Sequence, residues 1–406
     1  MFLKNLFSKK DEISLLIDIG NGTISVASAI YKGNSSPYIL TNTIFPISIS
    51  LDSDLGTIVS SFEKMLNRVI VESIKKTFTS QYFNKKKHNK RVDNVLVSFS
   101  SPWFLSKTKE INITKDKEFI VTSNFLKSVL EKEAEVFVSE VSSSDEFFHK
   151  GQNSYIEKAV TRTKVNGYFV ENSIGKKTKN LELSIYMSLV LEEMVSSVNK
   201  IIKTHIHLEE KDIYIHTFPF VSFNVLGFLY PKTVNYILMD ITSEMTCFAL
   251  VNNGTIVSTS SFPIGRNFII KQISKVFGVS FEIAESFMHM FNKKKTDTNM
   301  TERMVDIFSD IEKEWAIYLE DSLIKLSPEM LLPTDLYITS EEDVAPIYMD
   351  FFNLSKNDST SDFRKNLNKI GLSRDLLNRL VSFKSDAKHS EFIAILSLYH
   401  KYTIHR

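Results

Sequence analysis

Residues 234–286 read VNYILMDITSEMTCFALVNNGTIVSTSSFPIGRNFIIKQISKVFGVSFEIAES, and this stretch decides the fold. It begins with an apolar run that closes on Asp240, the composition of a buried strand that carries a carboxylate to the edge of a sheet. Asn253 and Gly254 predict a tight turn, because both residue types tolerate a positive φ. The predicted elements are three strands and an amphipathic helix, at 234–241, 246–251, 255–262 and 267–277.

The same order of features occurs at the start of the chain. An apolar run ends at Asp18, and a Gly20-Asn21-Gly22 turn follows it. Three strands and a long helix are predicted there, at 13–19, 23–31, 38–45 and 55–78. Two copies of this unit, spaced roughly half the chain apart, predict an internal duplication. Two unrelated hairpins are the alternative.

Composition limits the class of protein. A chain of 406 residues can form two or more lobes with sizeable cores. Its 49 Lys and Arg nearly balance 48 Asp and Glu, so no basic field favours nucleic acid. The single cysteine, Cys247, excludes an intrachain disulfide and suggests a thiol in the core. No apolar stretch approaches the roughly 20 residues of a membrane span, and no signal peptide is visible, so we expect a cytoplasmic protein.

The segment after the first helix differs from both repeated units. A helix is predicted over 123–138 with Ser123 as its cap, and SSSD at 142–145 is expected to end it. The predicted strands around this helix are 94–99, 107–113, 155–164, 167–171 and 181–189. We therefore expect a subdomain inserted into the first lobe, over 93–183.

The second half of the chain completes two lobes. We expect the first lobe to comprise 1–92 and 184–230, and the second lobe to comprise 231–406 with a helical insertion at 281–327. His216 lies at the end of a predicted strand and either approaches a phosphate or is structural. The remaining predicted elements are helices at 191–204, 218–229, 281–291, 301–326, 345–352 and 391–399, and strands at 213–215 and 336–339.

Four motifs together resemble the FtsA/PilM branch of the actin-like ATPases. Asp18-Ile19-Gly20-Asn21-Gly22-Thr23 resembles the first phosphate turn of that family, and Asp240-Ile241-Thr242-Ser243-Glu244-Met245-Thr246 resembles the second. Phe262-Pro263-Ile264-Gly265 resembles its "PIGG" connection, and Ala284-Glu285 resembles its Ala-Glu helix. The resemblance covers nearly the whole chain. It implies an α/β, actin-like two-lobe fold with duplicated RNase H-like lobes and an inserted α+β subdomain.

The resemblance also implies a nucleotide site with Mg²⁺. Asp18 and Asp240 would be the catalytic carboxylates on the metal side. Gly20, Asn21, Gly22, Thr23 and Thr246 would contact the phosphates, since backbone N–H groups in such turns hold phosphate oxygens. Thr242, Gly265, Glu285 and Ser340 occupy further positions where the family holds ATP.

Several of these positions depart from the pattern of the family. Thr242 replaces a glycine, Ser25 replaces a basic or polar residue, and Met288 replaces a lysine that contacts the nucleoside. Residues 340–342 read Ser-Glu-Glu where the family has a Gly-Gly turn beneath adenosine. Added Cβ atoms and two carboxylates disfavour a polyphosphate ligand. We therefore expect weak or lost binding of ATP and at most slow hydrolysis.

The functional expectation is a scaffold at the inner face of the membrane. The resemblance implies a role in type IV pilus assembly, as in PilM, or in cell division, as in FtsA. Expected partners are a membrane protein of that machinery and further copies of the chain. Residues 1–10, MFLKNLFSKK, could add contact with an anionic membrane or could be a frayed end. The alternatives are an active sugar kinase or acyl-phosphate kinase on the same fold and a chaperone-type ATPase, which would need a further peptide-binding domain.

Overall fold

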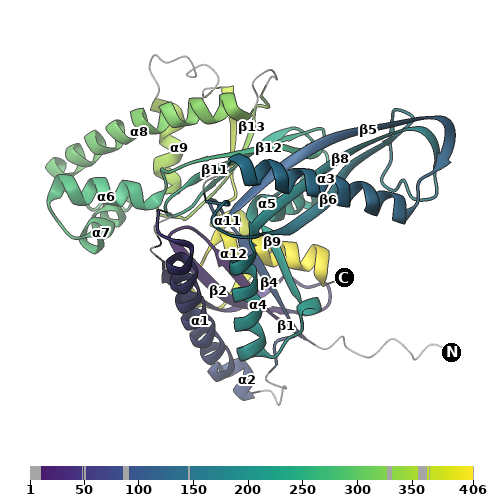
Figure 1. Ribbon diagram of the computed structural model, residues 1–406. Coiled ribbons are helices and arrows are strands. Elements are labelled where there is room, and N and C mark those ends of the chain that lie inside the picture. Colours follow the sequence, from purple (N-terminus) through teal and green to yellow (C-terminus); the bar gives the residue numbers. More distant parts are fainter. Residues whose placement is uncertain are drawn as a thin grey trace.

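The computed structural model describes residues 11–47, 49, 52–85, 91–144, 147–326, 332–354, 364 and 366–405. Within these ranges the strands form three sheets (Figure 1). Two sheets belong to the two predicted lobes, and the third belongs to the inserted subdomain. The proposed membrane segment 1–10 lies outside the described residues.

The sheet of the first lobe has the order β15-β3-β2-β1-β4-β9. β1 to β3 form an antiparallel meander, and β4 and β9 continue the sheet in parallel. These strands are Glu12–Ile19 (β1), Thr23–Tyr31 (β2), Tyr38–Pro46 (β3), Asn94–Phe99 (β4), Ile213–Thr217 (β9) and Ser382–Phe383 (β15). The helices α1 (Leu55–Thr79) and α4 (Glu192–Ile206) pack on one face, and α2 (Gln81–Lys85) follows α1.

The sheet of the second lobe repeats this arrangement, with the order β12-β11-β10-β13-β14. Its meander is again antiparallel and its last two strands are again parallel, which confirms the predicted duplication. The strands are Tyr236–Ile241 (β10), Thr246–Asn252 (β11), Thr255–Phe262 (β12), Asp335–Ser340 (β13) and Asn368–Gly371 (β14). The helices are α6 (Arg266–Phe277), α7 (Phe281–Asn292), α8 (Thr298–Leu326) and α9 (Ala345–Leu354).

Two apolar helices lie between the lobes and join their cores. α5 (Phe218–Leu229) packs against α12 (Glu391–Tyr399), and their side chains share one cluster with residues of both sheets (Figure 1). Leu16 of the first sheet and Leu238 of the second both belong to this cluster. Three short helical segments complete this part of the chain: Glu210–Asp212 (η1), Arg374–Leu377 (α11) and His400–Ile404 (η2).

The inserted subdomain is a sheet of order β5-β8-β6-β7 with one helix on it. Its elements are Phe104–Ile120 (β5), Ser123–Ser144 (α3), Asn153–Val165 (β6), Tyr168–Phe169 (β7) and Lys177–Leu191 (β8). One end of this sheet contacts β12 of the second lobe through hydroxyl groups, for example Ser106 Oγ and Thr259 Oγ1 at 3.0 Å. The other end projects away from both lobes (Figure 1).

The connectivity differs from the expected lobe composition in two places. β4 was expected in the insertion. It instead pairs in parallel with β1, because the chain returns to the first sheet after crossing over through α1. α12 and β15 were expected in the second lobe. They belong to the first, since β15 pairs with β3 and α12 packs against β1. β14 was not predicted.

The expected ends of two helices were also wrong. α3 extends through Ser144, so the polar SSS run does not end it, and residue 145 lies outside the described residues. Its first turn is capped by Thr122 rather than by Ser123, because Thr122 Oγ1 accepts from the Phe125 N–H at 3.2 Å. α8 starts three residues before the predicted start, with Asp297 accepting from the Met300 N–H at 2.8 Å.

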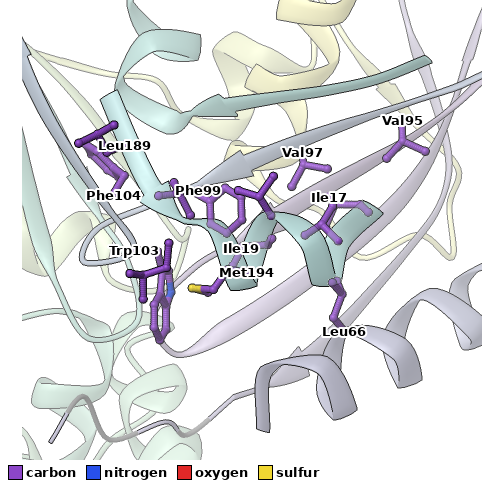
Figure 2. Close-up of a cluster of buried hydrophobic side chains, with 14 of the residues drawn as sticks. Ile17, Ile19, Leu66, Val95, Val97, Phe99, Trp103, Phe104, Leu189 and Met194 are labelled. Atoms are coloured by element: carbon purple, nitrogen blue, oxygen red, sulfur yellow. The ribbon is translucent and has the colours of Figure 1, made fainter. Parts of the chain in front are cut away.

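The core beneath the first acidic turn is densely apolar (Figure 2). Ile17 and Ile19 of β1 and Phe99 of β4 lie with Met194 of α4 in this cluster, all fully buried. Trp103 is also fully buried, and its indole Nε1–H donates to the Gly20 carbonyl at 2.8 Å. The core therefore fixes the position of the turn that begins at Gly20.

Candidate functional site

A cleft of about 650 Å³ is lined by both acidic turns and by residues of the helices α6 and α7, which follow the second turn. Both lobes contribute to its walls. The predicted site residues that line it are Asp18, Gly20, Thr23, Thr242 and Glu285. Further lining residues include Arg266, Glu341, Asp343 and Arg374, none of which was predicted as a binding residue.

Two buried aspartates lie near the ends of the central strands β1 and β10: Asp18 lines the cleft, and Asp240 lies near enough for the charge of Asp18 to raise its pKa. Burial raises the pKa of Asp18 to about 7, although Ser98 Oγ donates to its carboxylate at 3.0 Å. Burial likewise raises the pKa of Asp240 to about 7, against a hydrogen bond from Thr339, and the charge of Asp18 raises it further. Two facing carboxylates that resist ionisation together are suited to holding a divalent cation.

Of the two aspartates, Asp240 has the carboxylate that would gain more from a bound cation. Its side chain is 4% exposed, and its Oδ1 has no hydrogen-bond partner within the part of the chain that the structure describes. A buried, unpaired carboxylate oxygen costs free energy, and a cation would offset this cost. The pair Asp18 and Asp240 therefore fits the predicted Mg²⁺.

The two acidic turns touch each other directly. A Cβ added to Gly22 would lie 2.5 Å from Cβ of Ser243. The first turn can approach the second this closely only because Gly22 has no side chain. The Gly20 N–H donates to the Thr23 carbonyl at 2.9 Å and closes its own turn. Gly22 is thus required here for contact between the lobes.

Thr242, which stands where the family has glycine, closes the second turn. Its N–H and its hydroxyl both donate to the Met245 carbonyl, at 2.9 and 3.0 Å. Its hydroxyl also accepts from the Met245 N–H at 3.3 Å. The side chain that replaces glycine is therefore engaged within the turn, although the residue still lines the cleft.

The start of α6 holds the second turn from the other side. The Arg266 N–H donates to the Thr242 carbonyl at 3.0 Å, and the Asn267 N–H donates to the Ser243 carbonyl at 2.7 Å. A Cβ on Gly265 would lie 2.5 Å from the Thr242 carbonyl oxygen, so only glycine fits. Two N–H groups at this helix start are consequently bonded to the protein itself.

Arg266 is the main functional feature that the sequence interpretation missed. Its guanidinium donates to Asp343 at 2.6 Å and to Glu285, and it lies 3.3 Å from Glu341. Burial opposes its charge, but the bond to Asp343 and the nearby carboxylates raise its pKa above the usual value. An arginine directly after Gly265, in a motif that resembles PIGG, was the signal available in the sequence.

The carboxylates around Arg266 also approach a metal-binding geometry. One ligand atom from each of Glu285, His289 and Asp343 lies within 4.8 Å of the others. Arg266 already bonds to Glu285 and Asp343, so a guanidinium cation stands where a metal ion would have to bind.

Several predicted residues lie away from the cleft wall. Thr246 is fully buried, and its hydroxyl donates to the Ile264 carbonyl at 2.5 Å. Ser340 is 5% exposed at the end of β13. His216 is structural, since its ring bonds to Glu157 at 3.2 Å and to Tyr399 at 3.1 Å. The other predicted residues outside the lining set are Asn21, Gly22, Asp240 and Gly265.

Two residues that the sequence analysis discussed are buried, and for Cys247 this confirms the expected thiol in the core. Cys247 is 5% exposed, and burial raises the pKa of its thiol to about 12, so it is unreactive. Met288, at a position where the resemblance implies a nucleoside-contacting lysine, is fully buried in the core of the second lobe. It supplies no polar contact to the cleft.

Comparison with known proteins identifies the fold. No protein-family model and no curated protein matches the chain. A solved PilM–PilN type IV pilus biogenesis complex is similar, with a TM-score of 0.57 and 12% identity over 96% of this chain and 98% of that chain. The ethanolamine utilization protein EutJ from Carboxydothermus hydrogenoformans matches with a TM-score of 0.44 and 10% identity over 97% and 91% of the two chains.

A protein of unknown function with an actin-like ATPase fold, from Bacteroides thetaiotaomicron, matches with a TM-score of 0.36 and 10% identity over 95% and 96% of the chains. No helix among the described residues has the length and apolarity needed to cross a bilayer. The duplicated sheets agree with the likeness to the PilM–PilN structure over nearly the whole of both chains. The chain therefore has the two-lobed fold of the actin-like ATPases.

Proposed function

We propose that this protein is a PilM-like scaffold that acts by assembling with a membrane-complex protein of a type IV pilus, and that it binds ATP weakly or not at all. The match to a PilM–PilN complex over almost the whole of both chains supports the scaffold role. The ion-pair cluster of Arg266 is the single observation that supports weak binding of nucleotide.

The cluster obstructs a nucleotide in two ways. Glu285, Glu341 and Asp343 face the cleft and repel phosphate. Arg266 cannot offset this repulsion, because these three carboxylates already neutralise it. Freeing Arg266 would break a largely buried ion pair, at a cost of roughly 3 kcal/mol. A micromolar site would thereby weaken about 100-fold, to a dissociation constant on the order of 0.1 mM.

The phosphate side of the cleft is better preserved. Asp18 and Asp240 would hold Mg²⁺, which would supply positive charge to neutralise phosphate oxygens when bound. Gly20 and Thr23 line the same side. The side with Asp18 and Asp240 thus favours binding of a metal ion, whereas the Arg266 cluster opposes binding of the nucleotide. This contrast supports residual metal binding without efficient turnover.

Calorimetric titration with Mg-ATP tests the nucleotide part, with Asp240→Asn as the matched control and circular dichroism to verify folding. We expect a dissociation constant of about 0.1 mM or weaker. Micromolar binding with hydrolysis that requires Asp240 would instead establish the enzyme alternative, a kinase-type or ATPase activity on this fold.

Deletion of the gene in the source organism tests the scaffold role. We expect loss of surface pili with normal septation, and restoration by the intact gene. Filamentous cells with normal pili would overturn the pilus role and favour the FtsA-like role in division. Peripheral association with the inner membrane and self-association remain part of the proposal, and fractionation of cell extracts would test both.

A further inference from the structure

The far end of the inserted sheet forms a compact tip, which we define as residues 115–121 and 166–179. Backbone hydrogen bonds order it: the Gly175 N–H donates to the Val121 carbonyl at 2.8 Å, and the Val121 N–H donates to the Lys176 carbonyl at 3.0 Å. The ends of β5 and β8 that carry this tip project away from the lobes (Figure 1). The tip is therefore an accessible, folded feature.

Large apolar side chains are exposed at this tip. Tyr168 is 78% exposed and Phe169 is 63% exposed, directly after a turn in which Asn166 and Gly167 both have positive φ. Two further apolar residues of the tip, Ile120 and Ile174, are 52% and 50% exposed. Neighbouring exposed aromatics on a projecting turn contribute nothing to the core, and such patches commonly mark interaction sites.

Basic side chains surround these apolar groups. Lys117, Lys176, Lys177 and Lys179 are exposed, and none of them forms an ion pair within the described ranges. The aromatic rings themselves attract cations, as Lys164 Nζ lies 5.2 Å from the ring centroid of Phe169. Three carboxylates, Asp116, Glu118 and Glu171, are outnumbered by the five lysines of the tip, Lys115 included.

We propose that the tip binds the surface of an anionic lipid bilayer. Tyr168 and Phe169 would enter the headgroup region, while the unpaired lysines would bind lipid phosphates from above, with their aliphatic stems along the apolar surface. A narrow end can reach a flat bilayer without steric conflict from the lobes. This inference deepens the membrane-associated role proposed above, and it is independent of residues 1–10.

Sedimentation of the intact chain with vesicles tests the proposal. We expect binding to phosphatidylglycerol-containing vesicles, little binding to pure phosphatidylcholine, and weaker binding as salt rises. Tyr168→Ser with Phe169→Ser, and separately Lys176→Glu with Lys177→Glu, should each lower the apparent affinity about tenfold or more, because each variant removes groups that would contact the bilayer.

Matched controls are available elsewhere on the surface. Ile317→Ser with Ile324→Ser removes apolar groups that are 64% and 58% exposed on α8, and should leave vesicle binding unchanged. Lys75→Glu with Lys232→Glu alters charge at two exposed positions outside the tip and should have a much smaller effect. Equal losses in the tip variants and the controls would overturn the proposal.

A spectroscopic reporter locates the contact directly. Both native tryptophans, Trp103 and Trp315, are fully buried, so a Phe169→Trp variant adds the one exposed indole. Its emission should shift to the blue on addition of anionic vesicles, whereas that of Ile317→Trp should not. Absence of any shift while the intact chain still sediments with vesicles would assign binding to another segment and reject the tip. If the intact chain binds no vesicle, the lipid proposal fails, while the pilus and ATP tests stand.

Discussion

Nη2 of Arg266 lies 2.6 Å from Oδ2 of Asp343, so the start of α6 is joined to the segment that follows β13. The side chains of both residues are 11% exposed. Three carboxylates that would otherwise repel one another are held around this guanidinium. The ion pair thus stabilises the second lobe at the place where a nucleoside would be expected.

Arg266→Ala should destabilise the protein by roughly 3–5 kcal/mol, because it leaves buried carboxylates without a counter-charge. Urea unfolding followed by circular dichroism measures this change. Lys271→Ala is the matched control, since Lys271 bonds to Glu244 at 2.9 Å in an exposed pair and should cost less than about 1 kcal/mol. Similar costs for both variants would contradict the central role of Arg266.

Asp240→Asn should stabilise the metal-free protein at pH 8 and have little effect near pH 4. Burial raises the pKa of Asp240 to about 7 in the folded protein. The contribution of this carboxyl group to folding stability is therefore fully present below its pKa in the unfolded chain, near 4, and it is lost as the pH rises through 7. A rise of the pKa from 3.8 to about 7 corresponds to a gain of up to roughly 4 kcal/mol at pH 8, at ~1.4 kcal/mol for each unit of pKa. Thermal unfolding in EDTA at both pH values measures it, with Asp306→Asn as an exposed control. A gain that does not depend on pH would contradict the explanation.

Addition of Mg²⁺ should raise the melting temperature of the intact chain at pH 8, because a cation that binds only the folded state stabilises it by mass action. Asp18→Asn and Asp240→Asn should each abolish the rise. Differential scanning calorimetry with and without millimolar MgCl₂ gives the readout. An equal rise in all three proteins would indicate an unrelated ion effect.

Gly22→Ala should destabilise the contact between the two acidic turns, since the new Cβ would lie 2.5 Å from Cβ of Ser243. A loss of about 1–3 kcal/mol is typical for such overpacking. The double variant Gly22→Ala with Ser243→Gly removes the opposing atom and should recover part of that loss. Additive effects in this double-mutant cycle would show that the turns do not touch in solution.

Glu157→Ala should loosen the inserted subdomain from the first lobe. The Glu157 carboxylate is 4% exposed; it accepts from the Thr217 N–H at 2.7 Å and bonds to Ser188 and His216. Removing it leaves buried donors unpaired, at about 1–3 kcal/mol for each group. Limited proteolysis should then release the subdomain earlier than in a Glu110→Ala control, because Glu110 is largely exposed.

The repeated strands could be predicted because their signals are local. β2, β4 and β12, as well as α5 and α12, lie where the apolar runs and turn residues placed them. Which lobe α12 and β15 complete was not predictable, because that depends on packing between residues hundreds of positions apart. The facing of Asp18 and Asp240 was inferred through family resemblance rather than from spacing.

The role of Arg266 illustrates the other limit. A single charged residue after Gly265 gives no periodic signal, and its partners come from two separate segments, α7 and the stretch after β13. Thr242 was interpreted as a departure from glycine, but its hydrogen bonds to Met245 depend on the shape of the turn. Side-chain partners of this kind become visible only when the backbone is known.

α12 supplies a helix to the first lobe from the far end of the chain, and this has a consequence during synthesis. Ser14 of β1 hydrogen-bonds His400 at 3.1 Å, across 386 positions of sequence. The first sheet is translated early, yet its face against α12 stays uncovered until residues 391–404 leave the ribosome. The second lobe can form its own helical core before that moment, so we expect the lobe encoded first to be the one that finishes folding last.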